Sequence, residues 1–74
     1  MQEKLLSVIN SVLSNSGLDK ISELNPNTNL RNDLELDSIS LAELAALIDT
    51  KFGVDINSQG MFETIGDIQN RLSK

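Results

Sequence analysis

The first part of the chain repeats apolar residues with the period of an α-helix. They fall at the offsets of one helical stripe: Leu5, Leu6, Val8, Ile9, Val12 and Leu13. Gly17 follows at a position where helices commonly end. The pattern predicts an amphipathic helix over roughly residues 2–15.

A second helical pattern begins near Asp37 and ends at Gly53. Lys51 falls in its last turn, where a cation suits the helix dipole. Leu47 widens a core stripe formed by Leu41, Leu44, Ala45, Ile48 and Phe52. The spacing predicts a helix that buries this stripe.

A narrower apolar row on the same helix is left unexplained by the core stripe. Ile39, Ala42 and Ala46 form it, with Glu43 and Asp49 nearby. A helix that is apolar beyond one face is buried on two sides or meets a partner. The alternative is that the alanines are simply good helix formers and that Ile39 packs under the loop.

The C-terminal part predicts a short element followed by a helix. A brief extended piece at 54–56 is followed by the polar "NSQG" segment, which leads to Met61 and Phe62 in a turn or short helix that caps the core. Thr64 and Asp67 form a capping box that begins a helix over about 65–73. Its core face consists of Ile65, Ile68 and Leu72.

The segment between the first two helices, residues 18–36, is rich in turn formers. Pro26 stands among several asparagines, which argues against a long regular element, although a turn of helix near 19–24 fits the pattern. Regularly placed apolar residues predict that the loop packs across the helices: Leu18, Ile21, Leu24, Leu30, Leu34 and Leu36. We expect one all-α domain over residues 1–74, a small four-helix bundle of three main helices plus a short third helix, with a long first loop.

Composition excludes several functions. A net charge of -5 disfavours nucleic acid and anionic lipid, and favours basic partners. No secretory signal or apolar run of about 20 residues is visible, so we expect a cytoplasmic protein without membrane insertion. For so small a protein we expect a monomer. The chain contains neither cysteine nor histidine, which excludes a thiol nucleophile, a Ser-His-Asp triad and an ordinary zinc site. We therefore expect a protein that is not an enzyme and has no catalytic or metal-binding residues.

The most informative residues lie at the start of the second helix. If Asp37 caps this helix, the hydroxyl of Ser38 lies near free backbone N–H groups, where a phosphate ester is favoured. The two residues can equally be plain capping residues. A Ser40–Glu43 capping box is a further alternative, which would begin the helix at Ser40 and leave Ser38 in the loop. A calcium loop is excluded, because Ser38 and Leu44 occupy positions that need glycine and an acid.

The stretch "LDSI", Leu36 to Ile39, resembles the "DSL" signature of acyl carrier proteins. The resemblance extends across nearly the whole chain, through "DSISLAELAALIDTKFGVDI" and "FETIGDIQNRL". It implies that Ser38 receives 4′-phosphopantetheine from coenzyme A, with Asp37 as its signature neighbour. The chain departs from the family pattern at Ile39, Ser40 and Lys51, and lacks the usual glycine before the signature.

The resemblance also implies a set of partners. It places the recognition face of the second helix on Ile39, Ala42, Glu43, Ala46 and Asp49. With Glu35, these residues give an apolar strip in an acidic rim, suited to fast, transient docking on basic patches. The implied partners are a phosphopantetheinyl transferase and acyl-transferring, condensing and acyl-loading enzymes.

We therefore expect a standalone acyl carrier protein of fatty acid or polyketide-type biosynthesis. An aminoacyl or peptidyl carrier is the alternative within the same class. The alternative from another class is an acidic helical adaptor that carries no covalent group and docks through the second helix.

Overall fold

The computed structural model describes residues 2–73 and contains the predicted helices. They are α1 (Gln2–Asn15), α2 (Ser38–Phe52), the 3₁₀ helix η1 (Ile56–Gln59) and α3 (Ile65–Leu72). Within these residues the only strand-like pairing is an isolated antiparallel bridge between Asn29 and Thr64. The predicted all-α class, with a short third helix and a long first loop, is confirmed.

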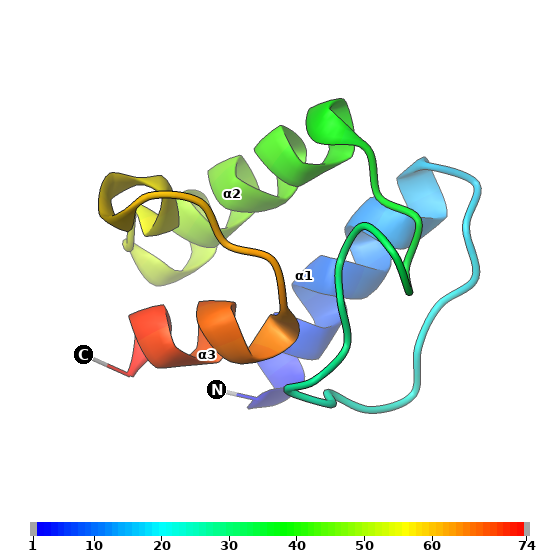
Figure 1. Ribbon diagram of the computed structural model, residues 1–74, viewed down its shortest axis with the longest axis horizontal. Helices are drawn as coiled ribbons and strands as arrows, with labels where there is room; N and C mark the ends of the chain where they lie inside the picture. Colours follow the sequence, from blue (N-terminus) through cyan, green and yellow to red (C-terminus); the bar gives the residue numbers. More distant parts are fainter. Residues whose placement is uncertain (1, 74) are drawn as a thin grey trace.

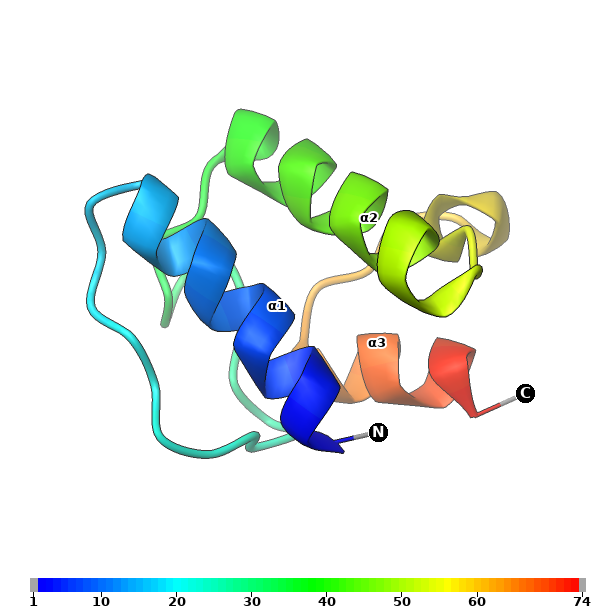
Figure 2. The ribbon, with the colours of Figure 1, turned by 180° about the vertical axis from the view of Figure 1, so that it is seen from behind.

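The helices form a small bundle in which α1 packs against α2 (Figures 1 and 2). η1 contacts both α2 and α3, so the chain between these helices closes one end of the bundle. The loop from 16 to 37 leads away from the end of α1 and returns to the start of α2 (Figure 1). The long loop therefore delivers the chain to the start of α2, where the candidate site lies.

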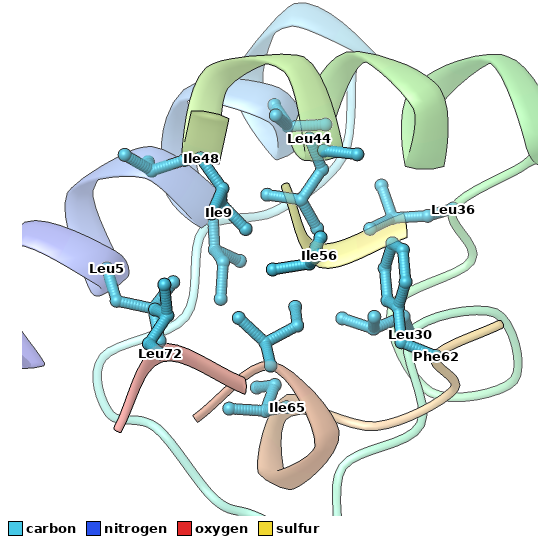
Figure 3. Packing of buried hydrophobic residues seen from close by; sticks show 14 of the residues in the cluster. Leu5, Ile9, Leu30, Leu36, Leu44, Ile48, Ile56, Phe62, Ile65 and Leu72 are labelled. Atoms are coloured by element: carbon cyan, nitrogen blue, oxygen red, sulfur yellow. The ribbon is translucent and has the colours of Figure 1, made fainter. Parts of the chain in front are cut away.

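The core is formed by apolar side chains from every helix and from the loop (Figure 3). The α1 stripe is buried as predicted, apart from the half-buried Leu6. In α2, Leu44, Ala45 and Ile48 are buried, while Leu41, Leu47 and Phe52 are half-buried. Phe62 is the one aromatic residue of this buried cluster, within the described part of the chain. The predicted core stripes are confirmed.

The long loop is tied to α1 by a side chain. Asn10 donates from its Nδ2 to the Ile21 carbonyl at 3.0 Å, and its Oδ1 accepts the Ile21 N–H at 2.8 Å. Ile21 thus pairs with α1 instead of forming local backbone bonds, and its neighbours Ser22 and Glu23 form only a bend. The predicted turn of helix near 19–24 is therefore wrong.

The loop is also tied to the start of α3. The Leu30 N–H donates to the Glu63 carbonyl at 2.8 Å, and the Gly66 N–H donates to the Pro26 carbonyl at 3.0 Å. A Cβ at Gly66 would lie 2.9 Å from the Pro26 carbonyl oxygen, so glycine permits this close approach. The loop is consequently an ordered part of the bundle.

The expected extended piece at 54–56 is only partly present. Val54 and Asp55 lie outside regular structure, but Ile56 already belongs to η1. The Asp55 side chain accepts the Asn57 N–H at 3.0 Å and thereby caps the 3₁₀ turn one residue earlier than expected.

Candidate functional site

Asp37 caps α2 and makes Ser38 the first residue of the helix. The Asp37 backbone is extended, with φ -93° and ψ -178°, and its carboxylate accepts the Ser40 N–H at 2.8 Å. Ser40 is the third residue of the helix and is buried, with its Oγ 2.8 Å from that of Ser16, so it is not the cap. The alternative helix start at Ser40 is therefore wrong, and the exposed Ser38 side chain stands at the N-terminus of α2.

The Asp37 carboxylate is held in its charged form. The N–H of Ser40 donates to it and lowers its pKa below the usual value, with a smaller contribution from the Ser40 hydroxyl. This N–H is one of those that a helix start leaves unpaired. It already faces a negative charge, so a phosphate on Ser38 would share the helix dipole with Asp37.

Arg31 contacts Ser38, a pairing that the sequence did not reveal. Its Nη2 donates a hydrogen bond to the Ser38 Oγ. Arg31 belongs to a tight turn in which the Asn29 side chain accepts its N–H at 2.9 Å. The Asn29 N–H in turn donates to the Asp33 carboxylate at 2.7 Å. The stretch "NLRND" places Asn29 and Asp33 four positions apart, a spacing at which the two residues can pair across a turn. This signal could have predicted the turn, although not the contact with Ser38.

A pocket of about 240 Å³ opens beside Ser38, between α2 and the segment after η1. Its lining consists of Arg31, Ser38, Leu41, Ala42, Asn57, Met61 and Phe62. An adjoining pocket of about 330 Å³ shares Arg31, Leu41, Met61 and Phe62, and extends the hollow to Asn29, Asn32 and Glu63. The Ser38 hydroxyl thus lies at one end of a partly apolar depression.

Met61 forms an exposed wall of both pockets instead of capping the core, a feature that the sequence did not reveal. Its side chain is 82% exposed. Its carbonyl accepts a 2.6 Å hydrogen bond from the Arg71 guanidinium, which also binds the carbonyls of Ile56 and Gly60. The Arg71 guanidinium lies 5.7 Å from the Phe62 ring centroid. Arg71 therefore fixes the path of the wall from within α3.

The residues predicted for partner binding are all exposed. Ile39 is 80% exposed, so the alternative that it packs under the loop is wrong. Ile39, Ala42, Glu43, Ala46 and Asp49 share one side of α2 by their helical spacing. We call these five residues the α2 outer face.

Glu35 lies apart from this face, in the loop before the cap. It is exposed, and its φ of 62° places it in the left-handed region, where glycine is favoured. This is the stretch in which the glycine expected from the resemblance is missing. A side chain there costs about 1 kcal/mol of backbone strain.

The described residues hold neither a metal-ion cluster nor a membrane-spanning helix. Among residues 2–73 no group of three or more acidic side chains is arranged to hold a metal ion. In the same range no helix combines the length and apolarity needed to cross a membrane.

Known proteins match the chain along its length. The family described as "Phosphopantetheine attachment site" matches residues 3–72. The "Meromycolate extension acyl carrier protein" of Mycobacterium leprae (strain TN) is 28% identical over 75 residues, which cover 99% of this chain and 65% of the relative. The "Acyl carrier protein" of Borreliella burgdorferi (strain ZS7) is 30% identical over 74 residues, which cover 97% of this chain and 92% of the relative.

The geometry at Ser38 fits a phosphate ester. The hydroxyl is exposed on the first residue of a 15-residue helix. A guanidinium, whose planar donors suit phosphate oxygens, already contacts that hydroxyl. The adjoining pocket leaves room for a chain that continues from the phosphate.

Proposed function

We propose that this chain, which belongs to the phosphopantetheine attachment site family, is an acyl carrier protein modified on Ser38. Members of this family carry 4′-phosphopantetheine covalently. The observation that carries the assignment to Ser38 is its exposed hydroxyl at the first position of α2, beside a cation and a pocket. Ser40, the nearest other serine, is buried against Ser16 and is a poor acceptor.

The attachment is a phosphoryl transfer to the Ser38 oxygen. The hydroxyl oxygen bonds to the β-phosphorus of coenzyme A, and the pyrophosphate bond breaks, releasing adenosine 3′,5′-bisphosphate. The hydroxyl proton passes to a base supplied by the transferase. The attached group supplies a thiol that holds acyl groups as thioesters, whereas the chain itself does no catalysis.

The α2 outer face is the docking surface in this proposal. Ile39, Ala42 and Ala46 supply an apolar strip, and Glu43 and Asp49 supply negative charge beside it. Basic patches on the transferase and on acyl-transferring, condensing and acyl-loading enzymes fit this surface. Charge attraction speeds encounter, while a small apolar contact allows fast release.

The relatives support a role in fatty acid-type synthesis. The first relatives that the chain matches are longer, and the chain spans 65% of their length. Their name refers to meromycolate extension, and the Borreliella burgdorferi relative is named acyl carrier protein. We propose residues 1–74 as a single carrier domain that acts in the cytoplasm, where coenzyme A is available, as a monomer.

Intact-protein mass spectrometry tests the proposal. The chain is incubated with coenzyme A, magnesium and a broad-specificity phosphopantetheinyl transferase. Ser38→Ala removes the acceptor, and Ser22→Ala serves as the control because Ser22 is an exposed serine of the long loop. One phosphopantetheine adduct is expected on the wild type and on Ser22→Ala, and none on Ser38→Ala.

Two results would overturn the proposal. A folded wild type without any adduct would leave an acidic adaptor that docks through α2. An adduct on folded Ser38→Ala would move the attachment to another serine. Circular dichroism of each sample shows whether the helices are intact.

A further inference from the structure

We propose that Arg31 binds the phosphate group that modification places on Ser38, and that it thereby fixes the direction in which the arm leaves α2. This proposal rests on the proposed function. It concerns a residue of the long loop, outside the α2 outer face. Arg31 acts as a positioning residue and takes no part in bond formation.

The contact with Ser38 brings the guanidinium to the right place. Its Nη2 donates to the Ser38 Oγ in the unmodified chain. After modification this oxygen bridges to phosphorus and becomes a poorer acceptor, while the charged oxygens bonded to that phosphorus lie two bonds away. A guanidinium offers several donors in a planar fork that matches such oxygens. The same side chain can therefore exchange the hydroxyl for the phosphate with a small movement.

The backbone of Arg31 is held in place before any phosphate arrives. The Asn29 Oδ1 accepts the N–H groups of Arg31 and Asn32 at 2.9 and 2.8 Å. Leu30 is fully buried, and its carbonyl accepts the Leu36 N–H at 3.0 Å. Only the Arg31 side chain remains to be ordered, which reduces the entropy lost on binding a phosphate.

The side chains that precede Ser38 are mostly acidic, so a nearby cation would offset their repulsion of a phosphate. Asp33, Glu35 and Asp37 precede Ser38 within a few residues, and Asp37 is held in its ionised form. A phosphate there meets acidic neighbours and finds the Ser40 N–H already bonded to Asp37. Arg31 supplies the opposite charge at the point of attachment. Lys51, the cation on α2 itself, lies about 20 Å along the helix from Ser38.

Phosphorus NMR of the fully modified protein tests the proposal. The compared proteins are the wild type, Arg31→Gln, Arg31→Lys and the control Lys51→Gln, which removes one positive charge far from Ser38. The phosphodiester resonance of Arg31→Gln is expected to move away from that of the folded wild type, towards that of the urea-unfolded modified wild type, and to relax as a more mobile group. Arg31→Lys is expected to lie between Arg31→Gln and the wild type, because lysine keeps the charge but not the fork. Lys51→Gln is expected to match the wild type.

Salt provides a second readout on the same samples. At 1 M NaCl, where the Debye length is about 3 Å, the wild-type resonance is expected to move towards that of Arg31→Gln. The resonance of Arg31→Gln is expected to stay nearly unchanged. If Arg31 only stabilised the fold of the loop and did not bind the phosphate, the resonances of the wild type and of Arg31→Gln would respond to salt alike.

The outcomes separate this proposal from the proposed function. A wild type that takes up no adduct overturns the function on which the proposal rests. Complete modification of all four proteins, with the same phosphorus resonance in the wild type and Arg31→Gln, overturns the role of Arg31 alone. Nitrogen–proton spectra of the unmodified variants establish whether each is folded. If Arg31→Gln does not fold, the comparison of Arg31→Lys with the wild type still tests the proposal.

Discussion

α1 and α2 lie side by side and bury similar stripes, yet their exposed sides differ. The exposed residues of α1 are all polar: Gln2, Glu3, Lys4, Ser7, Ser11, Ser14 and Asn15. The exposed residues of α2 include Ile39, Ala42 and Ala46. Folding of this chain therefore accounts for the whole pattern of α1, whereas it accounts for only one side of α2.

The exposure of Ile39 is the largest part of this difference. Full burial of an isoleucine side chain contributes about 1.5–3 kcal/mol. With 80% of Ile39 exposed, the chain forgoes most of that contribution. An apolar side chain kept in water next to the proposed attachment serine is most simply explained by contact with another protein.

The largest expected effect comes from the buried stripes, where the two helices should behave alike. Ile9 in α1 and Ile48 in α2 are both fully buried. Truncation of either to alanine should cost about 2–5 kcal/mol, because it removes apolar contact and leaves a cavity. A domain of this size has roughly 3–5 kcal/mol in total, so Ile9→Ala and Ile48→Ala should each lose most of the stability of the wild type. Urea titration followed by circular dichroism measures this loss.

The matched variants for this experiment lie on the exposed sides. Ser11→Ala on α1 and Ala46→Ser on α2 should change the free energy of unfolding by no more than about 0.5 kcal/mol. If Ile9→Ala or Ile48→Ala unfolds at the wild-type urea concentration, the assignment of that stripe to the core is wrong.

The next largest effect should separate the exposed sides. Ile39→Asp on α2 should reduce the kcat/KM of phosphopantetheinyl transfer at least about tenfold, because it places a charge in an apolar contact. Ser11→Asp adds the same charge to α1 and should leave the rate unchanged. Both variants should keep the stability of the wild type to within about 0.5 kcal/mol. Steady-state transfer kinetics with coenzyme A as the donor provide the measurement.

Ile39→Leu sharpens the same test. Leucine preserves the apolar contact, so this variant should remain near the wild-type rate. Equal rates for Ile39→Asp and Ser11→Asp would mean that the α2 outer face is not used by the transferase.

A smaller effect is expected from the acids of the α2 outer face. Glu43→Lys combined with Asp49→Lys should lower the association rate constant with a basic partner about tenfold at low salt. The double variant should also lose much of the salt dependence of association, since screening acts on the attraction that it removes. Stopped-flow binding to the transferase at several ionic strengths provides both values.

The control changes the same number of charges elsewhere. Glu3→Lys with Asp19→Lys alters the exposed side of α1 and the long loop, and should affect association much less. If both double variants slow association equally, net charge and not the α2 outer face determines the encounter.

The helices could be predicted from the sequence because their signals are local. Asp37 and Gly53 bound α2, and Gly53 adopts the left-handed conformation expected after a helix, with φ 70°. Thr64 and Asp67 form the predicted capping box of α3. Periodicity then identified which side of each helix is buried.

The features that escaped prediction depend on the path of the loop. Asn10 and Ile21 pair across 11 positions, and this pairing replaced the expected turn of helix near 19–24. Arg31 meets Ser38 only because the turn that contains it folds back over the start of α2. Periodicity and capping rules describe neighbours along the chain, so they carry no information about such contacts.

Asp37 differs from the residues of the α2 outer face, because it is exposed and yet contributes to the stability of the fold. Its pKa is lowered from 3.8 mainly by the Ser40 N–H. A carboxyl group with a lower pKa in the folded state stabilises the fold above its unfolded pKa. That stabilisation is lost as the pH falls through 3.8 and then through the lower folded value. Exposure alone therefore does not show that a residue on α2 or at its cap takes part in docking.

The smallest expected effect follows from this titration. Asp37→Asn keeps a good cap, since asparagine accepts the same N–H, but it cannot lose a charge in acid. Below about pH 5 its thermal midpoint should fall less steeply than that of the wild type. Ser22→Ala, which changes no titratable group, should follow the wild-type slope. Thermal unfolding between neutral pH and pH 3 gives the three curves, and parallel curves for Asp37→Asn and the wild type would show that the cap charge does not contribute to stability.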